Sequence, residues 1–222
     1  MPTSDVDIPF GRWATPAQPA ACVSEVVGRI SGMAIASRHL HQGPAAFTVD
    51  DILNMPSDGL RYELFDGMLI VNPPPAPRHQ LALSRLSRLL VADAPADVEV
   101  IPPAIGWKPS DGRWFEPDIV VVPRSDIDLD SMFLDHPPLL IVEVLSPATE
   151  AYDRSLKFAA YDEGGVGAYW IVDPSVHAPS IDVFERIESG GSLTSVGHAE
   201  GEERLEISMP WPLTVVPADL VR

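Results

Sequence analysis

The most hydrophobic run of this chain, residues 139–145, carries a glutamate near its centre, Glu143. The run consists of Leu, Ile and Val apart from that residue, and prolines precede and follow it at Pro138 and Pro147. Such a segment predicts a central β-strand that is buried on both faces. An ionised carboxylate there is costly unless it pairs with a cation or holds a metal ion. Glu143 is therefore the first candidate for a functional residue.

A second segment repeats this pattern. Residues 119–122 are purely apolar, they end at Pro123, and Glu116 and Asp118 come directly before them. The segment again predicts a core strand, here with a carboxylate at its start. Two acids on two neighbouring core strands suggest that Asp118 and Glu143 share an ion.

Length and composition limit the class of protein. With 222 residues, of which 45% are hydrophobic, the chain can bury one good-sized core with appendages. The single cysteine, Cys22, excludes a disulfide within the chain and argues against a cysteine-based zinc site. The first residues lack a basic and apolar leader, and no stretch of about 18 apolar residues follows. We therefore expect a cytoplasmic protein with no membrane segment.

The charge is strongly acidic. The formal net charge is −17, whereas binding to phosphates without sequence preference normally rests on clustered Lys and Arg. The same excess of acid would attract Mg²⁺ or Mn²⁺. Lysine occurs only at Lys108 and Lys157. Because an ammonium and a guanidinium are not chemically equivalent, Lys157 is a position of interest.

The chain divides at about residue 45. Residues 1–45 are rich in Pro, Ala, Ser and Gly and lack periodicity, which predicts a poorly ordered N-terminal extension, and residues 46–222 are expected to form a single domain. The patterns in that domain predict the following elements: a capped helix from Thr48 to about Pro56, a hairpin over 60–71 with its turn at Asp66-Gly67, a helix over about 78–91, short strands at 98–101 and 113–115, a helix over about 149–163, a strand at 168–172 and short C-terminal β-segments.

The helix that follows the Glu143 strand carries a polar face. Asp153, Lys157 and Tyr161 recur every four residues and therefore line one side, beside an apolar stripe that includes Tyr152 and Leu156. This arrangement can place Lys157 over the two carboxylates. The alternative is an exposed Asp153–Lys157 pair, which is worth roughly 0.2 to 0.5 kcal/mol. The spacing alone leaves both open.

Several separated motifs between about residues 47 and 175 point to a known family. They are Arg61-Tyr62-Glu63-Leu64-Phe65-Asp66-Gly67, Pro117-Asp118, Glu143-Val144-Leu145-Ser146-Pro147, Asp153, Lys157, Tyr161, and Gly165-Val166-Gly167-Ala168-Tyr169-Trp170-Ile171-Val172-Asp173-Pro174. In this order they resemble the Uma2 family of bacterial endonucleases, within the PD-(D/E)XK, or restriction-endonuclease-like, superfamily. The resemblance implies an α/β (α+β) fold, with a mixed β-sheet core flanked by helices and additional C-terminal β-segments. It also implies a cytoplasmic bacterial protein, a homodimer, and a site dependent on Mg²⁺ or Mn²⁺.

The resemblance assigns roles to individual residues. Asp118 matches the metal-binding Asp of the superfamily and Glu143 its second acid, with the Val144 carbonyl as a further oxygen ligand. The superfamily pattern places a lysine two residues after the second acid, where this chain has Leu145. Lys157 is the candidate substitute, as in Uma2-like sequences where the lysine lies on the following helix.

Other matched positions extend the site. Glu63 matches an early acid of the family and can supply another metal contact, whereas Met68 departs from the acid that usually follows the hairpin glycine. His79 matches a histidine often present in the family, with a metal, phosphate or base role, or a hydrogen bond at the helix start, as its possible uses. Arg78 and Arg85 can contact a phosphate backbone from the same helix, or lie on its solvated face.

Three functions are compatible with these residues. The first is a metal-dependent endonuclease that hydrolyses nucleic-acid phosphodiester bonds, with DNA as the expected substrate. The second is a non-catalytic nuclease-fold module for binding or regulation, and the third is a carboxylate-metal hydrolase of a smaller phosphate ester. A cluster of Glu63, Asp118, Glu143 and Lys157 in one cleft would favour an enzyme. A basic rim around that cleft would favour nucleic acid over a smaller substrate.

Overall fold

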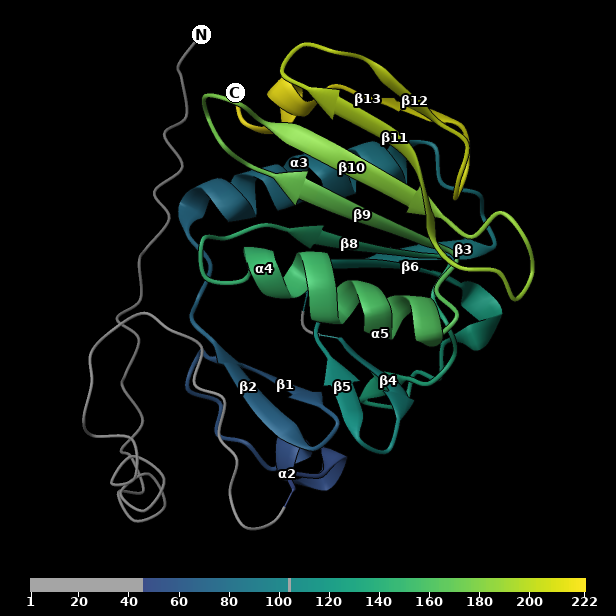
Figure 1. Ribbon diagram of the computed structural model, residues 1–222. Helices are drawn as coiled ribbons and strands as arrows, with labels where there is room; N and C mark the ends of the chain where they lie inside the picture. Colours follow the sequence, from purple (N-terminus) through teal and green to yellow (C-terminus); the bar gives the residue numbers. More distant parts are fainter. Residues whose placement is uncertain (1–45, 104) are drawn as a thin grey trace, which may run out of the picture. The chain divides into compact units, whose positions relative to one another are not determined.

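The computed structural model describes residues 46–103 and 105–222, and the extension expected over 1–45 lies outside them. The described residues form a six-stranded sheet, a five-stranded sheet and a two-stranded ribbon, together with helices (Figure 1). This is the mixed α+β architecture that the sequence predicts. None of the helices in the described ranges combines the length and hydrophobicity needed to cross a membrane.

The six-stranded sheet contains both strands that carry the candidate acids. Its order is β11-β10-β9-β8-β6-β3, and the one parallel pair within it is β8 with β9. A helical crossover joins these two strands, as a parallel connection requires. The bounds are β3 Val98–Ile101, β6 Ile119–Pro123, β8 Leu140–Val144, β9 Ala168–Asp173, β10 Ser180–Glu185 and β11 Thr194–Glu200.

The five-stranded sheet begins with the predicted hairpin. Asp66 and Gly67 both have positive φ, of 49° and 80°, as a tight two-residue hairpin turn requires. The order is β2-β1-β5-β4-β7, and β4 and β7 were not predicted. The bounds are β1 Arg61–Phe65, β2 Met68–Asn72, β4 Gly106–Ser110, β5 Arg113–Phe115 and β7 Phe133–Leu134, and the separate ribbon joins β12 Leu205–Ile207 to β13 Leu213–Val215.

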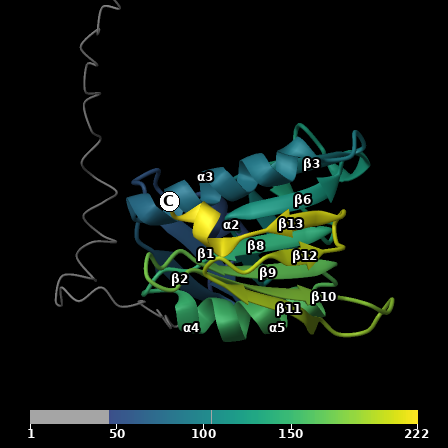
Figure 2. The same ribbon diagram turned by 90° about the horizontal axis from the view of Figure 1, so that it is seen from above.

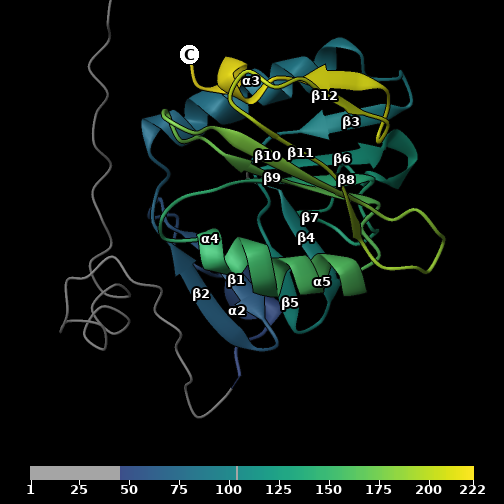
Figure 3. The same ribbon diagram turned by 45° about the horizontal axis from the view of Figure 1, so that its top comes forward.

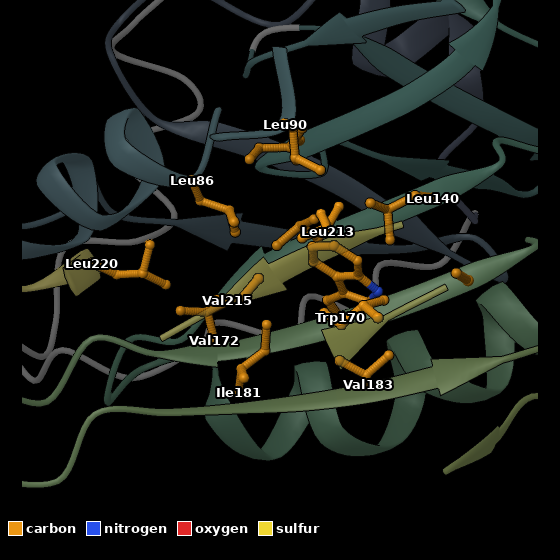
Figure 4. Packing of buried hydrophobic residues seen from close by; sticks show 14 of the residues in the cluster. Leu86, Leu90, Leu140, Trp170, Val172, Ile181, Val183, Leu213, Val215 and Leu220 are labelled. Carbon is orange, nitrogen blue, oxygen red and sulfur yellow. The ribbon is translucent and has the colours of Figure 1, made fainter. Parts of the chain in front are cut away.

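Two of the predicted helices are confirmed, and the longer one covers a face of the six-stranded sheet. The short α2 (Val49–Leu53) begins with a complete capping box between Thr48 and Asp51. The long α3 (Pro77–Ala92) packs on one face of the six-stranded sheet, together with the β12–β13 ribbon (Figures 1 and 2). Figure 4 shows this core, which includes Leu86, Leu90, Leu140, Trp170, Val172, Ile181, Val183, Leu213, Val215 and Leu220.

The opposite face of the six-stranded sheet faces the crossover helix and the five-stranded sheet (Figure 3). The crossover consists of α4 (Glu150–Tyr152), a π-helical segment (Asp153–Lys157) and α5 (Phe158–Glu163). Along β8, Leu140 and Val142 belong to the α3 core, whereas Ile141 belongs to this second core. Because side chains alternate along a strand, Glu143 points to the second face, beneath the crossover helix.

Candidate active site

The strand register brings the two predicted acids together. β6 and β8 are antiparallel, and Ile119 pairs with Val142. One step further along this register, Asp118 lies opposite Glu143, and residues directly opposite in an antiparallel pair project to the same face. The backbone N–H of Val144 also donates to Asp118 Oδ2 at 2.9 Å. The expected neighbouring arrangement of Asp118 and Glu143 is confirmed.

Lys157 joins acids from both sheets. Its ammonium Nζ lies 2.8 Å from Glu63 Oε1, on β1 of the five-stranded sheet, and 2.9 Å from Glu143 Oε1, on β8. All three residues are buried, with exposed fractions of 0–2%. Lys157 therefore bridges Glu63 and Glu143. The direct partners of Asp118 are Arg61 and His79. A charge buried this deeply is tolerated only because its partners are close.

The crossover helix contributes the remaining polar contacts on this side. Asp153 Oδ1 lies 3.5 Å from Lys157 Nζ, and the Tyr161 hydroxyl donates to Glu143 Oε1 at 2.6 Å. Asp153 and Lys157 are both buried, so the alternative of an exposed pair between them is wrong. The predicted apolar stripe is only partly correct, since Tyr152 is buried but Leu156 is 37% exposed.

Asp118 has its own set of cationic partners. Arg61 Nη1 donates to Asp118 Oδ1 at 2.8 Å, and His79 Nε2 lies 3.0 Å from Oδ2. His79 therefore contacts a candidate metal ligand from the first turn of α3. Arg61 is a site residue that the sequence reasoning missed. A usable signal existed, because Arg61 and Glu63 are two residues apart on one predicted strand and must share a face.

The electrostatics of the two acids differ. Burial opposes the charge of Asp118, but the hydrogen bond from His79 and the charge of Arg61 outweigh it and lower the pKa of Asp118 to about 2. Burial, opposed by Lys157 and reinforced by Asp153 and Asp118, raises the pKa of Glu143 to about 8. Burial also opposes the charge of Lys157, but Glu143 and Glu63 raise its pKa above the usual value. Lys157 therefore stays protonated, and Glu143 holds a proton over a wide pH range.

The buried carboxylates around Lys157 and Asp118 outnumber the permanent cations that contact them. Four buried carboxylates face two permanent cations, and we call these six residues the acid cluster: Glu63, Asp118, Glu143 and Asp153 against Arg61 and Lys157. With every carboxylate ionised the acid cluster would carry two excess negative charges, which a divalent ion would balance. Carboxylate oxygens are also the ligands that Mg²⁺ prefers. The donor chemistry fits such an ion.

The structure does not present these acids as a preformed metal cage. Within the described ranges, no group of three or more His, Cys, Asp or Glu side chains is arranged to hold a metal ion. The protein's own cations hold the carboxylates instead, Arg61 at Asp118 and Lys157 at Glu143. Any metal site here must therefore form by rearranging these side chains.

A pocket of about 220 Å³ lies beside the acid cluster. Two of its lining residues, Arg78 and Leu145, are sequence neighbours of His79 and Val144, the two residues that bond to Asp118 Oδ2. The pocket lies at the carboxyl ends of the parallel strands β8 and β9, where α/β sheets commonly bind ligands. Its lining is Arg78, Leu145, Ser146, Pro147, Glu150, Asp173, Pro174 and Ser175. The charged residues of this lining are Arg78, Glu150 and Asp173, so it does not form the basic rim that would favour nucleic acid.

The two arginines predicted on α3 have different surroundings. Arg78 is exposed and lines the pocket. Arg85 donates to the backbone carbonyl of Leu220 at 2.9 Å and to that of Arg222. Arg85 thus fastens α3 to the C-terminal segment, and only Arg78 of the two lies at the pocket.

One known protein family matches most of this chain. The sequence model of the family described as "Uma2: Putative restriction endonuclease" matches residues 49–216, which is most of the chain. The chain belongs to the Uma2 family. The matched range includes every residue of the acid cluster.

Two relatives of this Uma2 protein extend the comparison. The "Uncharacterized protein slr1290" of Synechocystis sp. is 24% identical over 157 residues, covering 66% of this chain and 76% of that protein. A crystal structure from Anabaena variabilis, described as a "putative nuclease belonging to DUF820", superposes with a TM-score of 0.60. It is 18% identical and covers 79% of this chain and 97% of its own. At that identity, the likeness confirms the nuclease-like fold of this Uma2 chain.

Proposed function

We propose that this Uma2 protein is a metal-dependent endonuclease that hydrolyses phosphodiester bonds in nucleic acid, with DNA as the first candidate. One observation carries the proposal: Lys157 Nζ lies within 2.9 Å of carboxylates from both sheets, and one of them is opposite Asp118. Strand β1 and the unit of β8 with its crossover helix, which are distant from each other in sequence, thus converge on a buried group of two acids and a lysine. Ordinary core packing does not require such a group, and perturbed ionisable groups concentrate at functional sites.

The proposed roles follow from the chemistry of each side chain. Asp118 and Glu143 would hold the metal ion, with Glu63 and the Val144 carbonyl as further oxygen ligands. Bound there, Mg²⁺ or Mn²⁺ would supply Lewis-acid polarisation of the phosphoryl group. Lys157, held protonated by its carboxylate neighbours, offsets the negative charge that builds on the phosphate in the transition state.

The remaining residues position the reacting groups. His79 holds one oxygen of Asp118 and so fixes the orientation of that carboxylate. Tyr161 does the same for Glu143 through its hydroxyl. Arg78 supports the approach of a phosphate group, since it carries the pocket's single guanidinium next to His79.

A second candidate is the hydrolysis of a smaller phosphate ester by the same residues. The pocket favours it, because Glu150 and Asp173 oppose Arg78 and would repel a run of phosphates. The net charge of −17 acts in the same direction. A small diester meets less of this repulsion than a polynucleotide does.

A substrate panel tests both candidates. Supercoiled plasmid, single-stranded DNA, RNA and bis-p-nitrophenyl phosphate would be incubated with the wild-type protein and Mg²⁺ or Mn²⁺, beside Asp118→Asn. Asp130→Asn is the matched control, since Asp130 is exposed on a loop. We expect cleavage by the wild type and the control, and a loss of at least about a hundredfold in Asp118→Asn. Cleavage of the small diester alone would favour the second candidate, and cleavage by Asp118→Asn at the wild-type rate would contradict both.

A further inference from the structure

The two oxygens of Asp118 are held differently. Oδ2 accepts from the backbone N–H of Val144 at 2.9 Å and from His79 at 3.0 Å. Oδ1 faces Arg61 alone among its hydrogen-bond partners within the described ranges, at 2.8 Å. A metal ion that takes one oxygen of Asp118 therefore meets the fewest competing donors at Oδ1, and Arg61 occupies that place.

Arg61 is also the more accessible of the two cations of the acid cluster. Its side chain is 20% exposed, whereas that of Lys157 is 3% exposed. The second nitrogen, Nη2, donates to the backbone carbonyl of Glu116, and Nε is buried without a hydrogen-bond partner. The Arg61 side chain is thus partly exposed, and its Nε–H donor is not used. It can move away from Asp118 without unpacking the core, whereas Lys157 cannot.

We propose that Arg61 holds the metal-facing oxygen of Asp118 until substrate arrives, and then exchanges that carboxylate for a phosphate of the substrate. This inference rests on the proposed metal-dependent function. A guanidinium matches a phosphate as well as a carboxylate, because its planar fork donates two parallel hydrogen bonds to either. Arg61 therefore becomes a substrate ligand when it leaves Asp118.

The exchange couples metal binding to substrate binding. In the free protein, a divalent ion has to displace Arg61 from Asp118, which weakens metal binding. A phosphate that draws Arg61 away removes this competition, and by linkage a bound metal ion frees Arg61 for the phosphate. The protein would hold its metal ion weakly when no substrate is present and tightly when substrate is bound.

Calorimetric titration of the full-length protein with Mn²⁺ tests the competition directly. Arg61→Gln should bind Mn²⁺ about tenfold more tightly than the wild type, because Oδ1 of Asp118 is freed. Arg61→Lys, which keeps the charge but lacks the planar fork that reaches Asp118 and the Glu116 carbonyl from separate nitrogens, should lie between the two. Cleavage at saturating Mn²⁺ should change in the opposite direction and fall about tenfold in Arg61→Gln, because a phosphate contact is lost.

Controls separate this inference from the proposed function. Arg113→Gln removes the same charge from a side chain that is 18% exposed and paired with Asp66 and Glu163, and it should leave Mn²⁺ affinity unchanged. If Arg61→Gln and Arg61→Lys bind Mn²⁺ no more tightly than the wild type, while Asp118→Asn abolishes binding, the exchange is wrong and the metal site stands. If neither the wild type nor the Arg61 variants bind Mn²⁺, or if Asp118→Asn binds it as tightly as the wild type, the proposed function and the exchange are both wrong.

Discussion

Lys157 Nζ lies 2.9 Å from Glu143 Oε1, and this contact joins β8, whose residues are all buried, to the helix that follows it. Both residues are 2% exposed. Glu63 reaches the same ammonium at 2.8 Å from the other sheet. Removing one partner of a buried ion pair leaves an uncompensated charge, so these contacts make stability and function depend on the same atoms.

The first prediction concerns Lys157. Above pH 8, where Glu143 is ionised and shares the Lys157 cation with Glu63, Lys157→Met should lower the free energy of unfolding by about 3 to 5 kcal/mol, because a buried carboxylate charge is left uncompensated. Urea unfolding would measure the change. Lys108→Met is the control, since Lys108 pairs with the exposed Asp111, and it should unfold like the wild type. Equal stability of the two variants would mean that the Lys157 contacts contribute little.

The second prediction concerns pH. Burial raises the pKa of Glu143 from its ordinary 4.5 to about 8, so folding takes up a proton at this residue between those values. The contribution of Glu143 to the free energy of unfolding should therefore be largest below pH 4.5. It should fall as the pH rises to 8. Glu143→Gln imitates the protonated form and should exceed the wild type by on the order of 1 to 4 kcal/mol in mildly alkaline solution. Parallel unfolding curves across this range would contradict the prediction.

The third prediction concerns Asp118, whose pKa is shifted the other way. His79 and Arg61 outweigh the effect of burial and lower it from 3.8 to about 2. Its contribution to stability should be complete above pH 3.8 and should be lost as the pH falls through 2. Acid unfolding of Asp118→Asn should lack this component. If the acid transitions of wild type and variant have the same slope, Asp118 is not held as an anion.

The fourth prediction concerns Tyr161. Its hydroxyl donates to Glu143 at 2.6 Å and is completely buried. Tyr161→Phe should cost about 1 to 3 kcal/mol, since Glu143 loses a buried donor. Tyr62→Phe is the control, because the Tyr62 hydroxyl bonds to Asp58 at the surface. Thermal unfolding that is the same for both variants would show that the buried bond adds nothing.

Much of the fold could be predicted from local patterns. The apolar runs at β6 and β8 identify buried strands whatever surrounds them, and the acids at Asp118 and Glu143 stand out for the same reason. The four-residue spacing of Asp153, Lys157 and Tyr161 correctly puts three polar groups on one helix face. These features depend on residues close in sequence.

Other features depend on packing between distant segments. Arg61 reaches Asp118 across 57 positions, and its spacing from Glu63 predicts a shared strand face but not this partner. The segment Asp153–Lys157 is π-helical rather than the regular helix that the spacing predicts, and Leu156 within it is 37% exposed. Strand β4 contains Pro109, which argues against a strand, but its pairing is irregular between Trp107 and Ser110 and accommodates the proline there.

The most direct test is the Mg²⁺ dependence of phosphodiester cleavage by the wild type and Glu143→Gln above pH 8. Glu143→Gln is expected to be at least as stable as the wild type there, so lost activity cannot come from unfolding. We expect saturable Mg²⁺-dependent cleavage by the wild type and by the exposed control Glu188→Gln, and a loss of about a hundredfold or more in Glu143→Gln. Cleavage by Glu143→Gln at the wild-type rate, or none by folded wild-type protein, would contradict a metal-dependent nuclease at this site.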